Sequence, residues 1–270
     1  MAEQASASPL ALPGTWDVVV DGYTSELAPL FETFASAALE VAGLEDKSAD
    51  VADVACGPGT LALLAAERGH RVKALDFAPA MIERLKLEAR KRQVDVDGVV
   101  GDGLALPWAD SSFDAAFSMF GLIFFADRDR GFRELLRVLR PGGTAVVSSW
   151  VPIARLEVMG GVFAILGELL KGPAPPTVLA DRESCIQEMS AAGFVDVVVE
   201  ERSVIAAHAS ADAMLQSFER SAAPLVLLKK QLGERWGDVR ADWLLKVIER
   251  FGAGPQEVEM IALLTAGQKS

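Results

Sequence analysis

Three aspartates stand where buried strands are expected to end, and they are the residues with the clearest chemistry. Asp53 lies in the apolar stretch 51–55, and the run DVACGPGT (53–60) continues into two glycines. A buried carboxylate in a strand is costly unless a partner compensates for it. Gly57 and Gly59 have no Cβ, so the backbone can come close to a ligand there. The helix expected to begin near Thr60 presents free N–H groups to a carboxylate or phosphate.

The same loop fits the pattern of dinucleotide-binding loops. In GPGTLA (57–62), Ala62 is the third small residue of the pattern Gly-x-Gly-x-x-Gly/Ala. Asp76 follows Gly57 by nineteen residues, close to the spacing of about 20 expected of a ribose-binding acid. Nicotinamide and adenosyl cofactors both carry ribose hydroxyls, so Asp76 predicts a nucleoside without choosing between them.

Asp53 and Asp102 favour one of these two ligand classes. A ligand ammonium group would pair with Asp53, whereas a pyrophosphate would be repelled by it. Asp102 lies at the expected end of the third strand, in GDGLALPWADSSFD (101–114), where its carboxylate can accept a hydrogen bond from an adenine amino group. Acids on three neighbouring strands therefore favour a cationic ligand with ribose and adenine. S-adenosylmethionine is such a ligand, because it carries a sulfonium, an ammonium, a carboxylate and adenosine.

The elements that position these acids alternate between strand and helix in the first half of the chain. Alternation of this kind predicts a mainly parallel sheet with helices on both faces, and ligands bind such sheets beyond the carboxyl ends of the strands. The expected strands are 51–55, 71–76, 97–102, 113–119 and, after a turn at RPGG (140–143), 144–150; the expected helices are 33–44, 61–69, 79–92 and 129–140.

In the second half of the chain the regular alternation of strand and helix ends, and the pattern predicts two closing strands with a helical insert between them. Two strands in this arrangement are expected to be antiparallel neighbours, with the insert over one edge of the sheet. The expected elements are a helix at 156–170, a loop at 171–177, a helix at 181–191, a strand at 193–201, helices within 210–251 and a closing strand at 258–267. The fold class is therefore α/β, a Rossmann-like three-layer sandwich with a seven-stranded, mostly parallel sheet and an antiparallel last strand.

Five segments together resemble a known family. They are VADVACGPGT, VKALDFAPAMI, GDGLALPWADSSFDAAFS, RELLRVLRPGG and IALLTAG. The chain resembles the class I S-adenosylmethionine-dependent methyltransferases and is most similar to the branch of quinone-biosynthesis and related small-molecule enzymes. This resemblance implies one domain over 1–270, with a cofactor-binding core at about 33–150. It also implies an acceptor-side lid from 1–30, 151–180 and 204–257.

The resemblance implies a role for each matching residue. The backbone around Ala55, Cys56, Gly57 and Gly59 would hold the methionine part of the cofactor, beside Asp53. Asp76 would bind the ribose hydroxyls, with Phe77 and Met81 against the adenine. Asp102 would take the adenine amino group, together with the backbone at Gly101, Gly103 and Leu104. Ser118 would face the methionine end, and Tyr23 would cover the cofactor from an N-terminal helix.

Two positions depart from the family pattern. Ala55 stands where the family usually has its first glycine, and alanine disfavours a positive φ angle. Ala78 replaces the hydroxyl residue often found before the second helix, so that helix has a weaker N-cap.

Methyl transfer needs mainly a nucleophile held in line with the methyl group and a site that excludes water. The acceptor is expected to be small and apolar or aromatic. The candidates for its roof are Trp150, Met159, Phe163, Met214, Phe218 and Trp243, although most of them are expected simply to pack the helices onto the sheet. The run SMFGLIFF (118–125) is expected to end beside the methyl group. No catalytic base is named. His70 is expected at the surface, and His208 in an exposed loop, with a position within reach of the acceptor as the alternative. Cys56 has no histidine close in sequence, and its loop requires small residues.

Composition narrows the choice of partners. The formal net charge is −12, which disfavours nucleic acid and anionic membrane surfaces. No apolar run reaches the length of about 18–20 residues that spans a bilayer, and residues 1–16 are expected to be a loose tail without a signal peptide. The only cysteines are Cys56 and Cys185, so a disulfide framework, a metal site and an iron–sulfur cluster are not expected. A cytoplasmic enzyme acting on a small molecule is expected, with homo-oligomerisation left open.

Two other functions are compatible with the sequence. A nicotinamide-dependent Rossmann oxidoreductase would share the glycine loop and Asp76, but it leaves Asp53 unexplained. A non-catalytic homologue would bind S-adenosylmethionine without producing S-adenosylhomocysteine.

Overall fold

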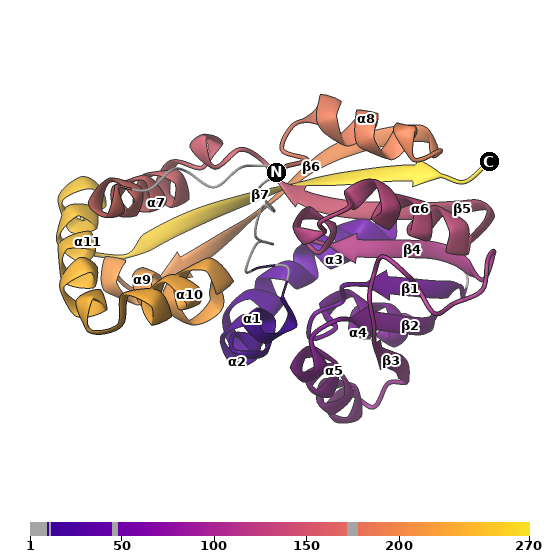
Figure 1. Cartoon of the computed structure of the whole chain (residues 1–270), viewed down its shortest axis with the longest axis horizontal. Helices are drawn as coiled ribbons and strands as arrows, with labels where there is room; N and C mark the ends of the chain where they lie inside the picture. Colours follow the sequence, from indigo (N-terminus) through magenta and orange to yellow (C-terminus); the bar gives the residue numbers. More distant parts are fainter. Residues whose placement is uncertain (1–9, 11, 45–47, 172–177) are drawn as a thin grey trace, which may run out of the picture.

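One sheet of seven strands organises the molecule, in the order β3-β2-β1-β4-β5-β7-β6 (Figure 1). The computed structural model describes residues 10, 12–44, 48–171 and 178–270. Strands β1 to β5 pair in parallel, whereas β7 is antiparallel to both β5 and β6. The predicted mostly parallel sheet with an antiparallel last strand is confirmed. The strands are β1 (Asp50–Val54), β2 (Arg71–Asp76), β3 (Val96–Val100), β4 (Phe113–Met119), β5 (Leu139–Trp150), β6 (Val195–His208) and β7 (Gln256–Gln268).

Helices cover both faces of this sheet and make the expected three layers. Helices α3, α4 and α5 pack on one face, and α6 and α8 pack on the other. The helices are α1 (Pro13–Asp17), α2 (Val20–Gly22), α3 (Ala28–Val41), α4 (Thr60–Glu67), α5 (Pro79–Arg92), α6 (Arg128–Val138), α7 (Glu157–Leu170), α8 (Arg182–Ala191), α9 (Ala211–Ser221), α10 (Ala223–Leu232) and α11 (Trp236–Phe251). Short turns of other helix types are η2 (Tyr23–Leu27), η3 (Leu122–Phe124), η4 (Ile153–Arg155) and η5 (Gly233–Arg235).

Strand β1 shows how the alternation of side chains places an acid among apolar residues. Ala52 and Val54 belong to the core cluster on the α6 and α8 face, and Val51 belongs to the cluster on the α4 face. Because successive side chains of a strand point to opposite faces, Asp53 shares the face of Val51 and lies at the start of α4.

The RPGG segment (140–143) differs from its prediction. A turn before the fifth strand was expected, but β5 already begins at Leu139, which pairs with Phe113. The next pair is Ala115 with Thr144, so residues 140–143 bulge out of a continuous strand. Gly142 has a φ angle of +77° and donates its N–H to the carbonyl of Lys269, which ties the bulge to the end of β7.

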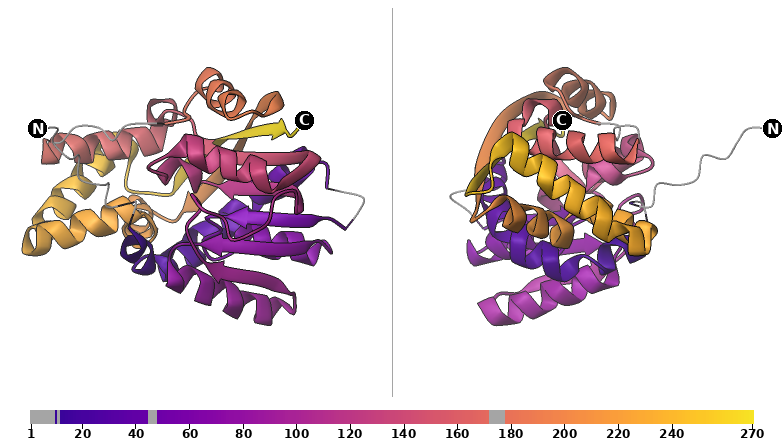
Figure 2. Two further views of the ribbon diagram at one scale, coloured as in Figure 1. Left: turned by 45° about the vertical axis from the view of Figure 1, so that its right-hand side comes forward. Right: turned by 90° about the vertical axis from the view of Figure 1, so that its left-hand side faces the viewer.

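Strands β6 and β7 are longer than predicted and carry the helical insert away from the rest of the sheet (Figures 1 and 2). The last β5–β7 pair is Trp150 with Ala262, but β6 and β7 continue to the pair His208 and Gln256. Residues 204–208 and 256–257, assigned to the lid from sequence, are therefore strand. The helices α9, α10 and α11 lie between them and pack with α7 around a separate core cluster.

Two smaller expectations differ from the structure, and a third concerns residues that are mostly outside the described part of the chain. The end of the expected loose tail is ordered, because α1 begins at Pro13. His70 is 6% exposed and accepts the Ala49 N–H at Nδ1, so the expected surface position was wrong. The predicted loop at 171–177 lies, apart from Lys171, outside the described residues. Among the helices that the structure describes, none is long and apolar enough to cross a membrane.

Trp243 gives a test of how the insert is held. Its side chain is fully buried, and its indole N–H donates to the carbonyl of Val162 in α7 at 2.8 Å. We expect Trp243→Phe to lower the free energy of unfolding by about 1–3 kcal/mol, because it removes this bond and leaves a gap. Equilibrium unfolding in urea measures the change.

Leu245 provides the matched control on the same helix, since it is 65% exposed. Leu245→Ala should change the free energy of unfolding by no more than about 0.5 kcal/mol. Equal effects of the two substitutions would contradict the role given to Trp243.

Candidate active site

A cavity of about 410 Å³ lies beyond the carboxyl ends of β1, β2 and β4. It is the position at which ligands bind open α/β sheets. The lining residues are Pro13, Trp16, Tyr23, Ala55, Gly57, Leu75, Asp76, Phe77, Met81, Asp102, Gly103, Leu104, Met119, Phe120, Gly121, Phe124, Phe125 and Ala126.

Most of the residues selected from sequence come together here. Of that set, Tyr23, Ala55, Gly57, Asp76, Phe77, Met81, Asp102, Gly103 and Leu104 line this cavity. Asp53 and Cys56 line a second cavity of about 30 Å³, which shares Tyr23, Ala55, Gly57 and Met119 with the first. Gly59, Gly101 and Ser118 line neither cavity. Ser118 is fully buried near the end of β4.

Asp53 is the most unusual group of the site. It is 1% exposed, and its Oδ2 accepts the N–H of Ala62 in the first turn of α4 at 3.1 Å. Its Oδ1 and the hydroxyl of Thr60 are buried without a hydrogen-bond partner in the described part of the chain. Both residues line the small cavity, which is large enough for about one water molecule. A compact group that donates hydrogen bonds would complete this arrangement.

Burial sets the ionisation of Asp53. Burial raises its pKa to about 7, since desolvation outweighs the Ala62 hydrogen bond and nearby Asp76 adds to the rise. The carboxyl group of Asp53 therefore titrates near neutral pH, and a cation beside it would favour the ionised form.

Asp76 lies at the end of β2 and organises the glycine loop. Its Oδ2 accepts the Gly57 N–H at 2.8 Å, and its Oδ1 accepts the Ala78 N–H at 2.9 Å. Burial raises the pKa of Asp76 to about 6, although the two N–H donors act in the opposite direction. Ala78 is the N-cap residue of α5, and its side chain cannot accept a hydrogen bond from the helix. The Asp76 carboxylate compensates in part, because it accepts the N–H of Ala78 itself.

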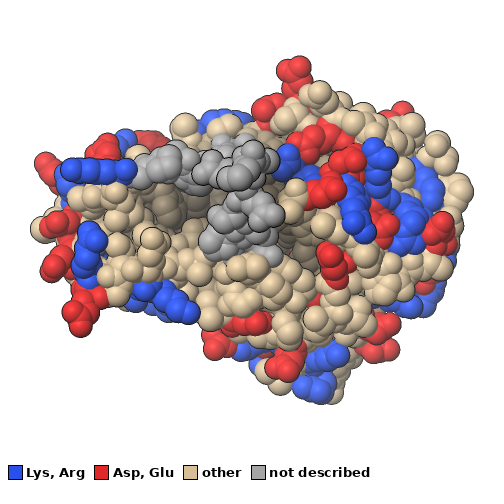
Figure 3. Space-filling view, viewed as in Figure 1, with Lys and Arg blue, Asp and Glu red and all other residues tan. Residues whose placement is uncertain are grey.

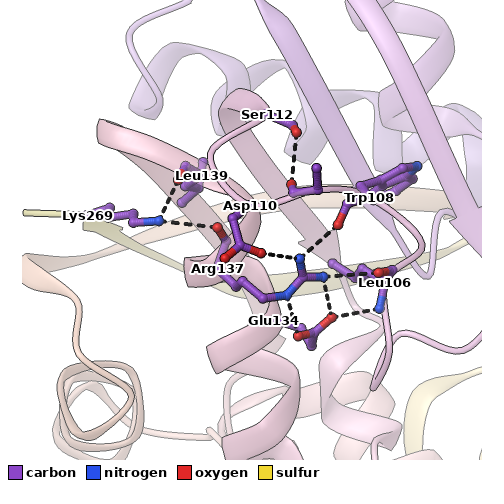
Figure 4. Close-up of polar contacts among 9 residues, drawn as sticks. Leu106, Trp108, Asp110, Ser112, Glu134, Arg137, Leu139 and Lys269 are labelled. Atoms are coloured by element: carbon purple, nitrogen blue, oxygen red, sulfur yellow. Dashed lines mark hydrogen bonds and ion pairs between the residues drawn. The ribbon is translucent and has the colours of Figure 1, made fainter.

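Asp102 is more exposed than the other two acids. It precedes a stretch of backbone that Arg137 and Glu134 hold in place, as Figure 4 shows for Leu106 to Ser112. Its Oδ1 accepts the Leu104 N–H at 2.9 Å. Farther along, Arg137 of α6 donates to the carbonyls of Leu106 and Trp108 at 3.0 and 2.8 Å. Glu134 bonds Arg137 and accepts the Leu106 N–H at 2.7 Å. The clamp fixes the backbone that presents Asp102 to the cavity.

Two residues at the cavity have strained backbones. Ala55 has a φ angle of +56°, so the left-handed turn is formed by alanine at a cost on the order of 1–2 kcal/mol. Phe120 also has a φ angle of +56°; its N–H bonds the Ser148 hydroxyl at 2.8 Å, and its ring stacks on Trp150 at 4.1 Å. Gly121 must be small, because a Cβ there would lie 2.4 Å from the Ala55 Cβ. Strain of this kind clusters at functional sites.

Sequence reasoning missed the aromatic wall contributed by the N-terminal helices. Trp16 of α1 lines the cavity and meets Phe124 edge to face, with ring centroids 4.9 Å apart. Its indole N–H donates to the carbonyl of Leu10 at 2.8 Å. The Pro-Gly-Thr-Trp signal at 13–16 could have indicated a helix start. Thr60 was also missed, although it is the first residue of α4.

The six candidates for the roof form a packing core, as was expected for most of them. Met214 and Trp243 are fully buried, Phe218 is 8% exposed, and all six roof residues belong to the cluster that joins the insert to the sheet. None of them lines the cavities of the described residues. His208 ends β6, half-buried, with its ring 6.1 Å from that of Phe218, so it is not an exposed loop residue. Burial and the two nearby aspartates raise the pKa of Cys56, which argues against a nucleophilic thiolate.

On the face that Figure 3 shows, acidic and basic side chains are interspersed, with uncharged surface between them. Among the described residues, no three His, Cys, Asp or Glu side chains are grouped so that they could hold a metal ion.

Comparison with known proteins agrees with this geometry. Residues 52–147 match the family model described as a methyltransferase domain. The chain is 36% identical over 162 residues to the demethylmenaquinone methyltransferase of Deinococcus radiodurans, which covers 53% of this chain and 67% of that protein. It is 30% identical over 202 residues to the Paenarthrobacter aurescens enzyme of the same name, covering 68% and 77% of the two chains. The match to the Thermus thermophilus enzyme, at 41% identity, covers only 50% of that protein.

Solved structures share the fold. A putative methyltransferase from Bacillus halodurans has a TM-score of 0.58 at 16% identity, over 88% of this chain and 99% of that one. A Haemonchus contortus N-methyltransferase in complex with phosphomonomethylethanolamine and S-adenosylhomocysteine has a TM-score of 0.56 at 17% identity, over 94% and 58%. The chain belongs to the class I S-adenosylmethionine-dependent methyltransferases, in the branch that includes the quinone-biosynthesis enzymes.

Proposed function

We propose that the chain binds S-adenosylmethionine across the two cavities and transfers its methyl group to a small apolar or aromatic acceptor. The observation that carries this proposal is the unpartnered, buried Oδ1 of Asp53 beside the Thr60 hydroxyl. An ammonium group supplies hydrogen-bond donors and a compensating charge together, which a pyrophosphate does not. For this reason the proposal favours an adenosyl over a nicotinamide cofactor.

The residues that would hold the cofactor follow from their positions. Asp53 and Thr60 would take the ammonium end, Asp76 the ribose hydroxyls, and Asp102 the adenine amino group. Phe77 and Met81, which line the larger cavity, would contact the adenine. Gly59, Gly101 and Ser118 would act from outside the cavities, by shaping the loops and the strand end that border them.

The bound cofactor would supply an electrophilic methyl group on a sulfonium, whose displacement leaves a neutral thioether and needs no acid. The chain's part is to exclude water and to orient the acceptor. Trp16, Phe124 and Phe125 give the cavity an apolar wall, which suits an aromatic acceptor. Burial and the charges of Asp76 and Asp53 raise the pKa of Tyr23, so its hydroxyl stays protonated and can donate a hydrogen bond. We assign no general base.

The acceptor class is inferred from this wall and from relatives that are named for demethylmenaquinone. The core at about 33–150 would bind the cofactor. Residues 1–30, 151–180 and the insert would form the acceptor side, and within that side the N-terminal helices would supply the contacts to the ligand. A cytoplasmic location and the absence of nucleic-acid binding stay predictions.

Calorimetry and product analysis test the proposal directly. We expect binding of S-adenosylmethionine and S-adenosylhomocysteine in the micromolar range and at least a hundredfold weaker binding of NAD. Release of S-adenosylhomocysteine should increase when hydroquinones, phenols or aromatic amines are added. Tight binding of NAD alone would overturn the cofactor assignment, and binding without product release across the panel would indicate a non-catalytic homologue.

Asp53→Asn tests the residue that carries the proposal. We expect it to weaken S-adenosylmethionine binding by about ten- to a hundredfold, since a charge-assisted contact contributes about 1.5–3 kcal/mol. Asp97→Asn is the matched control, because Asp97 is an exposed acid on β3. Calorimetry at pH 7.5 measures the affinity of both variants for S-adenosylmethionine. Equal affinities of the two variants would show that Asp53 does not contact the ligand.

The pH dependence of binding has a defined sign. The raised pKa of about 7 means that the Asp53 carboxyl is mostly protonated below neutral pH in the free protein. A cationic ligand needs the ionised form, so affinity should rise between pH 5.5 and 7.5 and binding should release a proton at the acidic end. The ligand's own amino group ionises at about pH 7.7–8.0, which sets the upper limit of the range. Calorimetry in two buffers of different ionisation enthalpy measures the proton, and Asp53→Asn should flatten the profile.

A further inference from the structure

The cover segment, residues 12–27, joins the cofactor-binding half of the molecule to the helical insert. It comprises α1, α2 and η2, and it contacts α5 on one side and α9 and α10 on the other (Figures 1 and 2). A small core cluster runs through all three parts, with Val19 from the segment, Met81 from α5 and Ala223 from α10. Trp16 and Tyr23 of this segment line the larger cavity.

The start of the cover segment is fixed to α5 by two acids. Asp17 accepts the N–H of Ala80 at 3.1 Å, in the first turn of α5. Ala78, the N-cap residue of that helix, provides no side-chain hydrogen bond, so Asp17 caps α5 from another part of the chain. Asp21 forms an ion pair with Arg84, one turn farther along the same helix.

The end of the cover segment is fixed to the insert by a single carboxylate. Glu26 accepts the Ser217 hydroxyl at 2.8 Å and two donors of Arg220, at 2.9 and 2.6 Å. Both partners belong to α9, and Ser217 is 6% exposed. The backbones also meet closely, because a Cβ on Gly22 would lie 1.9 Å from the Arg220 carbonyl oxygen. Helix α9 and the segment therefore form one packed unit.

Glu26 and Tyr23 share one turn of unusual geometry. The turn η2 (Tyr23–Leu27) is π-helical, a form that is rare and often found at functional sites. Its first residue, Tyr23, lines both cavities, and its fourth, Glu26, bonds the insert. A displacement of Glu26 must move the backbone that carries Tyr23.

We infer that Glu26 is a positioning residue: by bonding α9 of the insert, it holds Tyr23 against the cofactor site and makes the residence time of a bound nucleoside depend on the insert. This inference rests on the proposed cofactor binding. Glu26 itself lines neither cavity in the described chain, so its effect on a ligand has to pass through Tyr23.

The test measures dissociation of S-adenosylhomocysteine from the full chain by surface plasmon resonance. Glu26→Ala and Arg220→Ala should each raise the dissociation rate about three- to tenfold. The effect is moderate because the Arg220 side chain is 52% exposed and solvent weakens its ion pair. Glu26→Gln, which retains a hydrogen bond to Ser217, should give an intermediate rate. The double variant should dissociate no faster than the faster single variant, because both changes break one contact.

Glu201→Ala is the matched control, because Glu201 forms a doubly hydrogen-bonded pair with Arg155 at 2.9 Å, away from both cavities. Its dissociation rate should equal that of the wild type. Rates in the Glu26 and Arg220 variants that match the control would overturn the inference, as would additive effects of the two substitutions. A wild-type chain that binds no S-adenosylhomocysteine would instead refute the proposed function.

Discussion

Desolvation of two neighbouring carboxylates is the constraint on which the site depends. Asp53 and Asp76 end adjacent parallel strands, and they are 1% and 5% exposed. Asp53 accepts one N–H from α4, whereas Asp76 accepts the Gly57 N–H of the loop after β1 and the Ala78 N–H that follows its own strand. The charge of Asp76 adds to the rise in the pKa of Asp53. The proposed cationic ligand rests on the Oδ1 of Asp53, which has no hydrogen-bond partner among the described residues, because a buried charge is costly unless it is paired.

The loops around these acids are shaped by packing as much as by their own sequence. Ala55 accepts a left-handed conformation because Gly121 leaves room beside it. Gly59 combines a φ angle of +91° with a contact to Leu85, which a Cβ would approach to 2.1 Å. Arg137 of α6 fixes the loop that follows Asp102, because it donates hydrogen bonds to two carbonyl groups of that loop. At the start of β5, the bulge at 140–143 is tied to the end of β7 by the hydrogen bond from the Gly142 N–H to the Lys269 carbonyl.

The molecule divides its aromatic residues between two tasks. Those of the insert, such as Trp243 and Phe218, fill a core that attaches helices to the projecting ends of β6 and β7. Those near the N-terminus and after β4, such as Trp16 and Phe124, form the wall of the cavity. Among the described residues, the insert lines neither cavity and contacts the cavity wall through the cover segment.

The order of strands and helices, the antiparallel closing strand and the grouping of Asp53, Asp76 and Asp102 could be predicted from sequence, because they follow from local periodicity and the handedness of parallel connections. The lengths of β6 and β7 could not, since beyond the pair Trp150 and Ala262 these two strands pair only with each other. The wall at Trp16, the cap from Asp17, the burial of His70 and the packing role of Trp243 also required the tertiary structure. Each depends on contacts between residues distant in the chain, and such contacts leave no local pattern.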